Sequence, residues 1–408
     1  MRIPNSEFRI PHSEFRIPNS AFRDLFRSAH DTNLSVSFHT TFGCGTSMST
    51  IDYRRKQQQF DTTGQYANIL GFPEQAVEGL RAAEAADLHA CRTWLIRTVI
   101  VSGMGGSAIG GDILRSLAWR NLHVPYFVNR TYHLPGFIHD STLLIAMSYS
   151  GNTEETLSAY NEARDNGAAI IAITTGGELA ARAEADAVPI VRLPPGLAPR
   201  FALGYLFFAL LGTMRHLGLL EIEDEDIAET IAMLRRKGEA LGRLDDPENE
   251  AIAIAERLHG KLPVLYSGPE LLEAAAMRWR CQIEENAKTL AYSNVIPELN
   301  HNEIVGWERN PDLLGRIAVL LLRDPADAPE IARRFDVTIE LIRAVAGDII
   351  EVRPTSTAPL ARIMELICIG DWVSFYLALG TDTDPFPIEK INALKAALAQ
   401  IPAAPTGN

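Results

Sequence analysis

The chain has 408 residues, of which 47% are hydrophobic and 22% are charged, and its formal net charge is −13. This composition is ordinary for a globular protein with a large core, the length suggests two domains, and the negative charge disfavours a nucleic-acid or anionic-membrane partner. The cysteines Cys44, Cys91, Cys281 and Cys368 lie far apart without metal-ligand spacing, which is typical of a reduced, cytoplasmic protein. No run reaches the roughly 18 apolar residues that a membrane span needs. The most apolar stretch, Phe201 to Met214, is expected to be a buried helix.

The first 47 residues carry a seven-residue repeat unlike the rest of the chain. Arg-Ile-Pro-Asn-Ser-Glu-Phe at 2–8 recurs with small changes at 9–15 and 16–22. A proline in each unit excludes a regular helix, and the segment lacks the apolar core of a signal peptide. We expect residues 1–47 to be a disordered, non-native extension that precedes a true start at Met48. The alternative is an interaction tail, and loss of activity on deletion would favour it.

From about Thr98 the chain alternates β-like runs with helical stretches. Strands are expected at 98–101, 126–129, 143–147, 169–173 and 190–193, and helices at 153–166 and 201–219. A second unit begins near Lys261, with strands expected at 263–268, 317–322 and 348–353 and helices at 269–288 and 360–379. Such alternation predicts parallel sheets with helices on both faces, and ligands then bind at the carboxyl ends of the strands.

Two runs rich in glycine and hydroxyl groups follow expected strands of the first unit and open helices. They are Gly-Met-Gly-Gly-Ser-Ala-Ile-Gly-Gly-Asp at 103–112 and Ser-Tyr-Ser-Gly-Asn-Thr-Glu-Glu-Thr at 148–156. Glycine allows close backbone approach, and free N–H groups at a helix start attract an anion. The pair therefore predicts a site for a phosphorylated small molecule. The candidate phosphate-binding residues are Gly105, Gly106, Ser107, Ser148, Ser150 and Thr153.

Two other interpretations of these runs are weaker. Gly103-x-Gly105-x-x-Ala108 fits a loose dinucleotide fingerprint, but Asn129 and Arg130 stand where that fingerprint expects an acidic residue. Helix capping would explain one hydroxyl well, yet it explains three poorly.

With these motifs in view, the chain resembles the sugar isomerase (SIS) family and, more narrowly, its bifunctional phosphoglucose/phosphomannose isomerases. The resemblance runs from about Phe60 to the C-terminus. Besides the two runs, it is carried by Arg200 after a proline-rich loop, Glu-Asn-Ala-Lys at 285–288, Asn-His-Asn-Glu at 300–303 and Asp-Pro-x-Pro-Ile-x-x-Ile-x-x-Leu-Lys at 384–395.

The resemblance implies two SIS-type (flavodoxin-like) parallel-sheet αβα sandwich domains in tandem. After the extension at 1–47, an N-terminal helical segment is expected at 48–90 and the first SIS domain, which binds phosphate, at 91–220. A helical connector is expected at 221–255. The second SIS domain, with a C-terminal helix and the catalytic residues, is expected at 256–402.

Interconversion of an aldose phosphate and a ketose phosphate needs ring opening, a base that moves a proton between C1 and C2, and stabilisation of the enediolate. The resemblance implies Glu285 as the base, His301 as the ring-opening group, Arg200 beside the enediolate and Lys395 near the ring oxygen. Glu284 remains an alternative base, and Lys390 an alternative lysine.

The expected activity is interconversion of glucose 6-phosphate or mannose 6-phosphate with fructose 6-phosphate, without cofactor or metal. The expected partners are the hexose 6-phosphate and a second copy in a homodimer, with His301 acting across the interface. Nucleic acid and membranes are not expected partners. The alternatives are another SIS-family sugar-phosphate isomerase and a non-catalytic sugar-phosphate-binding regulator.

Overall fold

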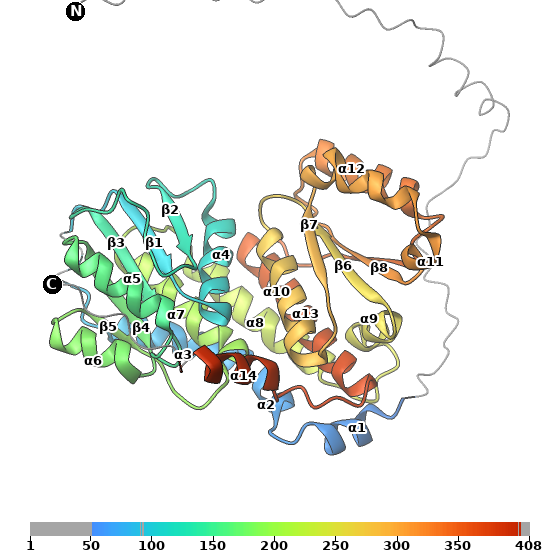
Figure 1. Ribbon diagram of the computed structural model, residues 1–408, viewed down its shortest axis with the longest axis horizontal. Helices are drawn as coiled ribbons and strands as arrows, with labels where there is room; N and C mark the ends of the chain where they lie inside the picture. The colour runs from blue at the N-terminus through green and yellow to red at the C-terminus, as the bar shows by residue number, and fades with distance from the viewer. Residues whose placement is uncertain (1–50, 90, 92–93, 399, 401–408) are drawn as a thin grey trace, which may run out of the picture. The chain divides into compact units, whose positions relative to one another are not determined.

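The computed structural model describes residues 51–89, 91, 94–398 and 400, so the expected extension at 1–47 lies outside the described residues. The described chain folds around two parallel sheets, as expected from the sequence (Figure 1). The first sheet has the order β2-β1-β3-β4-β5. Its strands are β1 (Thr98–Ser102), β2 (Tyr126–Asn129), β3 (Thr142–Met147), β4 (Ala169–Thr174) and β5 (Ile190–Arg192).

The second sheet repeats this arrangement with one strand fewer, in the order β7-β6-β8-β9. Its strands are β6 (Leu262–Ser267), β7 (Tyr292–Val295), β8 (Ile317–Leu322) and β9 (Asp348–Val352). β7 is not expected from the sequence, because its short, largely polar run lacks the apolar residues that mark β6 and β8. It pairs with β6 in parallel at the edge of the sheet, where a strand needs fewer apolar residues.

Helices cover both faces of each sheet. Those near the first sheet are α3 (Phe72–Ala85), α4 (Gly105–Ala118), α5 (Glu154–Asp165), α6 (Gly177–Ala185) and α7 (Leu203–His216). Those near the second are α9 (Glu250–Leu258), α10 (Glu273–Ala287), α11 (Pro311–Leu314), α12 (Pro329–Ile342) and α13 (Pro359–Gly380). The remaining α-helices are α1 (Tyr53–Phe60), α2 (Gln65–Leu70), α8 (Asp224–Leu241) and α14 (Glu389–Leu398). Short 3-10 turns lie at Pro199–Phe201, Glu298–His301 and Glu303–Glu308.

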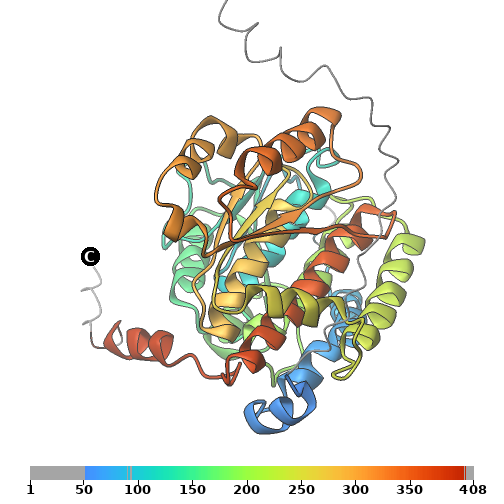
Figure 2. The same ribbon diagram turned by 90° about the vertical axis from the view of Figure 1, so that its right-hand side faces the viewer.

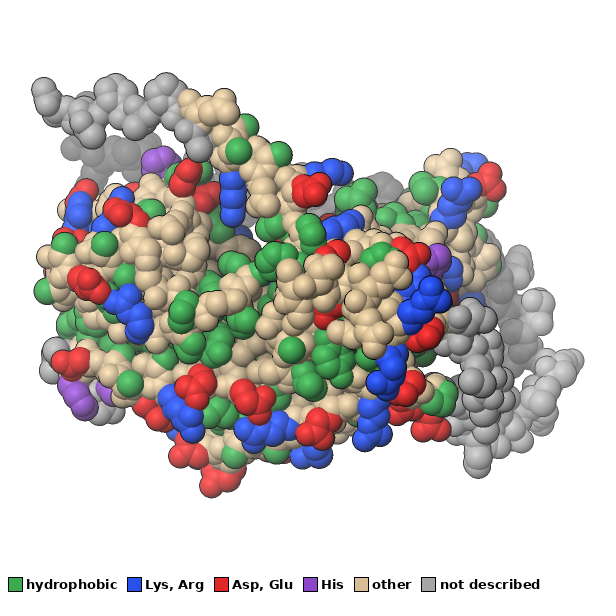
Figure 3. Space-filling view, turned by 90° about the horizontal axis from the view of Figure 1, so that it is seen from below, with side chains coloured by type: hydrophobic (Ala, Val, Ile, Leu, Met, Phe, Trp, Pro, Cys, Tyr) green, Lys and Arg blue, Asp and Glu red, His purple; other side chains and the backbone are tan. Residues whose placement is uncertain are grey.

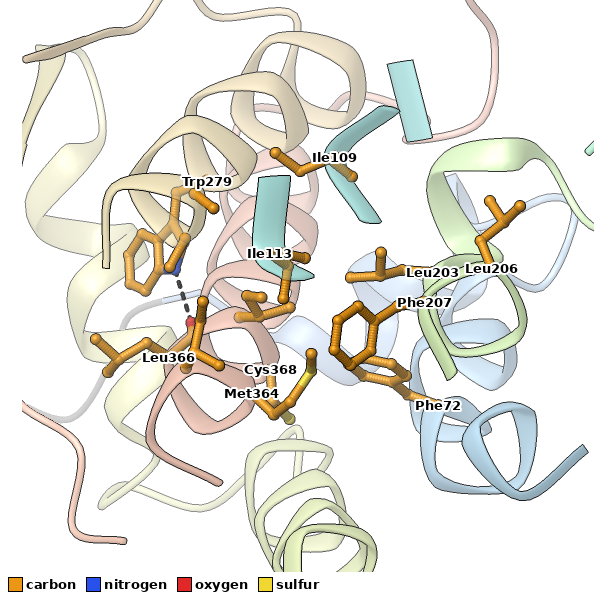
Figure 4. Packing of buried hydrophobic residues seen from close by; sticks show 14 of the residues in the cluster. Phe72, Ile109, Ile113, Leu203, Leu206, Phe207, Trp279, Met364, Leu366 and Cys368 are labelled. Carbon is orange, nitrogen blue, oxygen red and sulfur yellow. Dashed lines mark hydrogen bonds between the residues drawn. The ribbon is translucent and has the colours of Figure 1, made fainter. Parts of the chain in front are cut away.

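One large apolar core joins the two sheets. Helices that pack on the first sheet and helices that pack on the second sheet together form this core. They are chiefly α3, α4, α7, α10 and α13. Figure 4 shows Ile109 and Ile113 of α4 in this core, between Phe207 of α7 and Trp279 of α10. Smaller clusters cover the outer faces of the two sheets. Because α4 and α10 share this core, the carboxyl end of the first sheet is fixed relative to α10.

The helix α13 is the long apolar helix of this core. By length and composition it could cross a membrane, although Glu365 and Asp371 interrupt its apolar residues, so that it is no continuous apolar run. However, 94% of its most apolar window is buried inside the protein, as in a core helix. Cys368 on α13 and Cys91 are free and buried, and Cys281 is free and half-buried. On the face shown in Figure 3, acidic and basic side chains are interspersed, so the net negative charge forms no single patch there.

Candidate active site

The two glycine- and hydroxyl-rich loops follow the carboxyl ends of two neighbouring strands inside the first sheet. β1 and β3 lie side by side, and the chain leaves them toward opposite faces of the sheet, where doubly wound folds bind ligands. Gly105 begins α4 with a φ of +50°, a conformation that favours glycine. A Cβ on Gly106 would lie 2.5 Å from the carbonyl oxygen of Pro199. The first loop therefore packs directly against the segment that carries Arg200.

The hydroxyl groups of the two loops are tied together. The Ser107 Oγ accepts the N–H of Tyr149 at 3.4 Å, which links the first loop to the second. The Ser148 Oγ lies 2.8 Å from the Thr153 Oγ1 and accepts the N–H of Gly151 at 3.1 Å. Ser150 is exposed at the turn, and its Oγ accepts the N–H of Asn152. The structure thus gathers the predicted phosphate-binding residues at the carboxyl ends of β1 and β3.

Helix capping does not account for these hydroxyl groups. Met104 is the N-cap of α4 and Thr153 is the N-cap of α5, and neither side chain makes a capping hydrogen bond. Ser107 lies inside α4 rather than at its cap. The N-termini of both helices therefore lack a side-chain acceptor, which leaves them suited to an anionic ligand.

Arg200 and Glu285 meet although they belong to different halves of the chain. Arg200 lies in the 3-10 turn Pro199–Phe201, is 4% exposed, and holds its Nη1 3.8 Å from the Glu285 Oε2 near the end of α10. The guanidinium carbon lies 4.8 Å from the ring centre of Phe201 and 5.7 Å from that of Phe386. Burial lowers the pKa of Arg200, and the Glu285 and Asp384 carboxylates oppose that shift.

The neighbouring Glu284 lies in a different environment. Burial raises the pKa of its carboxyl group, while the charge of Arg280 and the N–H of Ala291 oppose that effect. Of the two glutamates, Glu285 is the one that forms an ion pair with Arg200. This contact favours Glu285 over Glu284 as the candidate base.

Lys288 is a further residue of the candidate site, and its motif alone assigns it no role. It ends α10 in the left-handed conformation, with a φ of +55°. Its Nζ donates to the carbonyl oxygens of Glu285 at 2.6 Å, Asn286 at 3.2 Å and Pro385 at 3.3 Å. Burial and the Arg200 charge lower the pKa of Lys288 to about 8, against the opposing effect of Asp384 and Glu285. The signal for it was its place in the Glu-Asn-Ala-Lys motif.

In the part of the chain that the structure describes, neither His301 nor Lys395 forms a hydrogen bond or an ion pair with Arg200 or Glu285. His301 ends the 3-10 turn Glu298–His301 beyond β7, and it is exposed. Lys395 and Lys390 lie on α14, which buries none of its described residues. Figure 2 shows α14 standing away from the two sheets. Among the described residues, no three His, Cys, Asp or Glu side chains are grouped so that they could hold a metal ion.

The second sheet lacks a comparable anion site at its own carboxyl edge. The loop after β8 brings carboxylates there, and a Cβ on Gly268, which follows β6, would lie 2.6 Å from the Asp327 Oδ1. Burial raises the pKa of Asp327 to about 6. Acidic groups at this position would repel a phosphate, which favours the first sheet as the candidate site.

Comparison with known proteins identifies both halves of the chain. Residues 96–198 match the SIS domain, and residues 247–398 match the bacterial phospho-glucose isomerase C-terminal SIS domain. A bifunctional phosphoglucose/phosphomannose isomerase of Caldicellulosiruptor bescii is 42% identical over 337 residues, which cover 82% of this chain and 99% of the relative. A protein of the same name from Aquifex aeolicus is 35% identical over 74% of this chain and 90% of its own length.

Solved structures share the fold at low sequence identity. A hypothetical protein from Thermus thermophilus superposes with a TM-score of 0.64 at 16% identity, over 86% of this chain and 93% of its own.

A relative from Sulfolobus acidocaldarius named D-glucosamine-6-phosphate 4-epimerase is 34% identical, but over only 50% of this chain and 61% of its own length.

Proposed function

This chain belongs to the bifunctional phosphoglucose/phosphomannose isomerase family, and we propose that it interconverts glucose 6-phosphate or mannose 6-phosphate with fructose 6-phosphate. One observation carries the proposal beyond family membership. The Glu285 carboxylate and the Arg200 guanidinium lie 3.8 Å apart. The segment that carries Arg200 packs against the first glycine-rich loop, where α4 begins. Proton transfer next to a phosphate anchor needs this combination of groups.

The chemistry follows from the charges of these groups. The 6-phosphate binds at Ser107, Ser148, Ser150 and Thr153 together with the N–H groups of Gly105 and Gly106. The Glu285 carboxylate takes the proton from C2 or C1 and returns it to the other carbon, while a hydroxyl proton passes between O1 and O2 of the sugar. The enediolate that forms between these steps is negatively charged, and the Arg200 guanidinium stabilises it.

Both aldose substrates are served by the same groups. Glucose 6-phosphate and mannose 6-phosphate differ only at C2, and that carbon is trigonal in their shared enediolate. Return of the proton to either face after rotation of the C2–C3 bond gives either aldose. A second activity therefore needs room around C2 rather than a further catalytic residue.

We infer that the active enzyme is a homodimer in the cytoplasm, in which His301 opens the sugar ring of the neighbouring subunit. His301 is exposed at the end of the 3-10 turn Glu298–His301, which leaves it accessible to a neighbouring subunit and supports this arrangement. In the same way, α14 would carry Lys395, or alternatively Lys390, to the ring oxygen. Both lysines lie on a helix that buries none of its described residues, so they are accessible to a second subunit.

Complementation tests the shared site. A Glu285→Ala protein and a His301→Ala protein are each expected to be inactive. If they exchange subunits, a mixed dimer has one site with both residues intact and regains part of the activity. A mixture that exchanges subunits, as followed by a size or affinity tag, but regains no activity would contradict the sharing of His301.

A coupled assay of the purified protein tests the reaction itself. Turnover is expected with glucose 6-phosphate and mannose 6-phosphate, and EDTA should leave both rates unchanged. Glucosamine 6-phosphate belongs in the same panel, because turnover of that substrate alone would favour the epimerase-like alternative. A non-catalytic regulator would bind sugar phosphates without turnover, whereas in an enzyme Glu285→Ala abolishes turnover and spares phosphate binding.

A further inference from the structure

A closed ring of buried hydrogen bonds connects the Arg200 segment to α10 and α13. The Arg200 Nε donates to the Asn286 Oδ1 at 2.9 Å, and the Asn286 Nδ2 donates to the Ser374 Oγ at 2.9 Å. The Ser374 Oγ donates to the backbone oxygen of Asp371 at 2.7 Å. The Asp371 carboxylate accepts two hydrogen bonds from Arg278, at 3.0 and 2.6 Å. Arg278 closes the ring by donating to the backbone oxygen of Arg200 at 3.0 Å.

Every member of the ring is removed from water. The exposed fractions are 4% for Arg200, 3% for Arg278, 6% for Asp371, and 0% for Asn286 and Ser374. A buried ion pair such as Arg278–Asp371 adds little net stability, because desolvation offsets the attraction of the charges. Apolar side chains would fill this volume at least as stably, so stability alone does not explain the ring.

The ring fixes which edge of the Arg200 guanidinium is available. Nε is bonded to Asn286, and Nη2 donates to the carbonyl oxygens of Pro385 at 3.0 Å and Phe386 at 2.6 Å. Among the described residues, Nη1 has no hydrogen-bond acceptor and faces the Glu285 carboxylate at 3.8 Å. Two N–H groups are thus left pointing to the place where the proposed enediolate forms.

Asn286 is suited to hold this orientation because both ends of its amide are in use. Its oxygen accepts from Arg200, and its nitrogen donates to Ser374, so a rotated amide would face Arg200 with a donor. Asn286 also follows Glu285 directly on α10. The same turn of this helix therefore carries the proposed base and the residue that holds Arg200.

We propose that Asn286 and Ser374 are positioning residues that aim the Nη1 edge of Arg200 at the enediolate, acting through Arg200 rather than on the substrate. This inference rests on the proposed isomerase function. Under this proposal the two parts of substrate recognition are separate. The loops of the first sheet bind the phosphate, and the ring affects only the stabilisation of the negative charge that develops at C1 and C2.

The test is Ser374→Ala, which removes one oxygen atom from the ring, with Thr230→Val as the matched control. Thr230 is equally buried, and its hydroxyl donates to the Asp226 backbone oxygen at 2.7 Å within α8, outside the site. In Ser374→Ala the Asn286 amide nitrogen loses its hydrogen-bond acceptor, so Asn286 no longer fixes the orientation of Arg200. Because small misplacements of a catalytic group are costly, kcat should fall about tenfold or more. KM should stay within about twofold.

Two phosphorylated ligands sharpen the readout. Glucitol 6-phosphate carries the phosphate without the enediolate charge, and its affinity should be unchanged in Ser374→Ala. A five-carbon aldonic acid phosphate places a carboxylate where the enediolate forms, and its affinity should fall in parallel with kcat. Asn286→Leu, which removes the contact with Arg200 directly, should show the same pattern more strongly.

The outcomes are distinct. If Ser374→Ala keeps the kcat of Thr230→Val, or if both ligands lose affinity equally, the positioning role is wrong. If Asn286→Leu fails to fold, Ser374→Ala decides alone, with its folding checked by thermal unfolding against the control. If the unmodified protein turns over no hexose phosphate, the proposed function fails instead of this inference.

Discussion

Gly370 of α13 packs directly against Trp279 of α10, and its replacement by alanine tests how tightly these two helices are joined. A Cβ at this position would lie 2.2 Å from the Trp279 Nε1 and 2.3 Å from its Cδ1, which real contacts do not allow. Trp279 cannot yield easily, because it is 1% exposed and donates its indole N–H to the Leu366 carbonyl at 2.7 Å (Figure 4). The added methyl group must therefore move the indole or separate the helices.

The cost can be worked from these contacts. Overpacking a core by one methyl group costs about 1–3 kcal/mol, and an indole N–H left without its acceptor costs about 1–3 kcal/mol more. The better helix propensity of alanine offsets about 1 kcal/mol. We expect Gly370→Ala to lower the free energy of unfolding by about 3 kcal/mol. Because Asp371 and Ser374 follow on the same helix, kcat should fall as well.

Chemical denaturation followed by circular dichroism measures this loss. The control is Gly238→Ala in α8, where a Cβ would meet nothing within 4 Å, and it should be neutral or stabilising by up to about 1 kcal/mol. Trp279→Phe should cost less in the Gly370→Ala background than in the unmodified protein, since the clash is already relieved. Equal stability of Gly370→Ala and the unmodified protein, or additive costs in the double variant, would show that Gly370 and Trp279 are not packed this tightly.

Three further predictions concern the site. The pKa of Lys288 is lowered in the folded protein to about 8 from an ordinary 10.5, so the unfolded chain binds more protons between these values and stability should rise across that range; in Lys288→Met the rise, followed by denaturation at each pH, should disappear. Glu285→Gln should lower kcat at least about a thousandfold with little change in phosphate affinity, measured by titration calorimetry, because the amide cannot accept the proton from carbon. Gly151→Ala should abolish phosphate binding or folding, because its φ is +72° and a Cβ would lie 1.8 Å from the Gly176 carbonyl oxygen; near-normal sugar-phosphate affinity would show that this turn does not shape the site.

Local sequence was enough to predict the two parallel sheets. Runs such as 317–322 are continuous and apolar because both faces of the strand are covered, and helices between them follow from the spacing. The glycine and hydroxyl loops after β1 and β3 could also be predicted, since a strand, a tight turn and a helix start are all encoded within a few residues. The edge strand β7 could not, because its stability comes from pairing with β6 rather than from its own residues.

The contacts that define the candidate site join residues far apart in the sequence. Arg200 meets Glu285 and the Pro385 carbonyl only because α4, α7, α10 and α13 share one core. The lowered pKa of Lys288 likewise depends on Arg200 and on burial that no local pattern reveals. Residue patterns along the chain predict every described strand except β7, the two candidate phosphate-binding loops and the residue types that could move protons. Only the tertiary structure decided which of those residues face one another, because burial and electrostatic coupling depend on distances in space and not on separation along the chain.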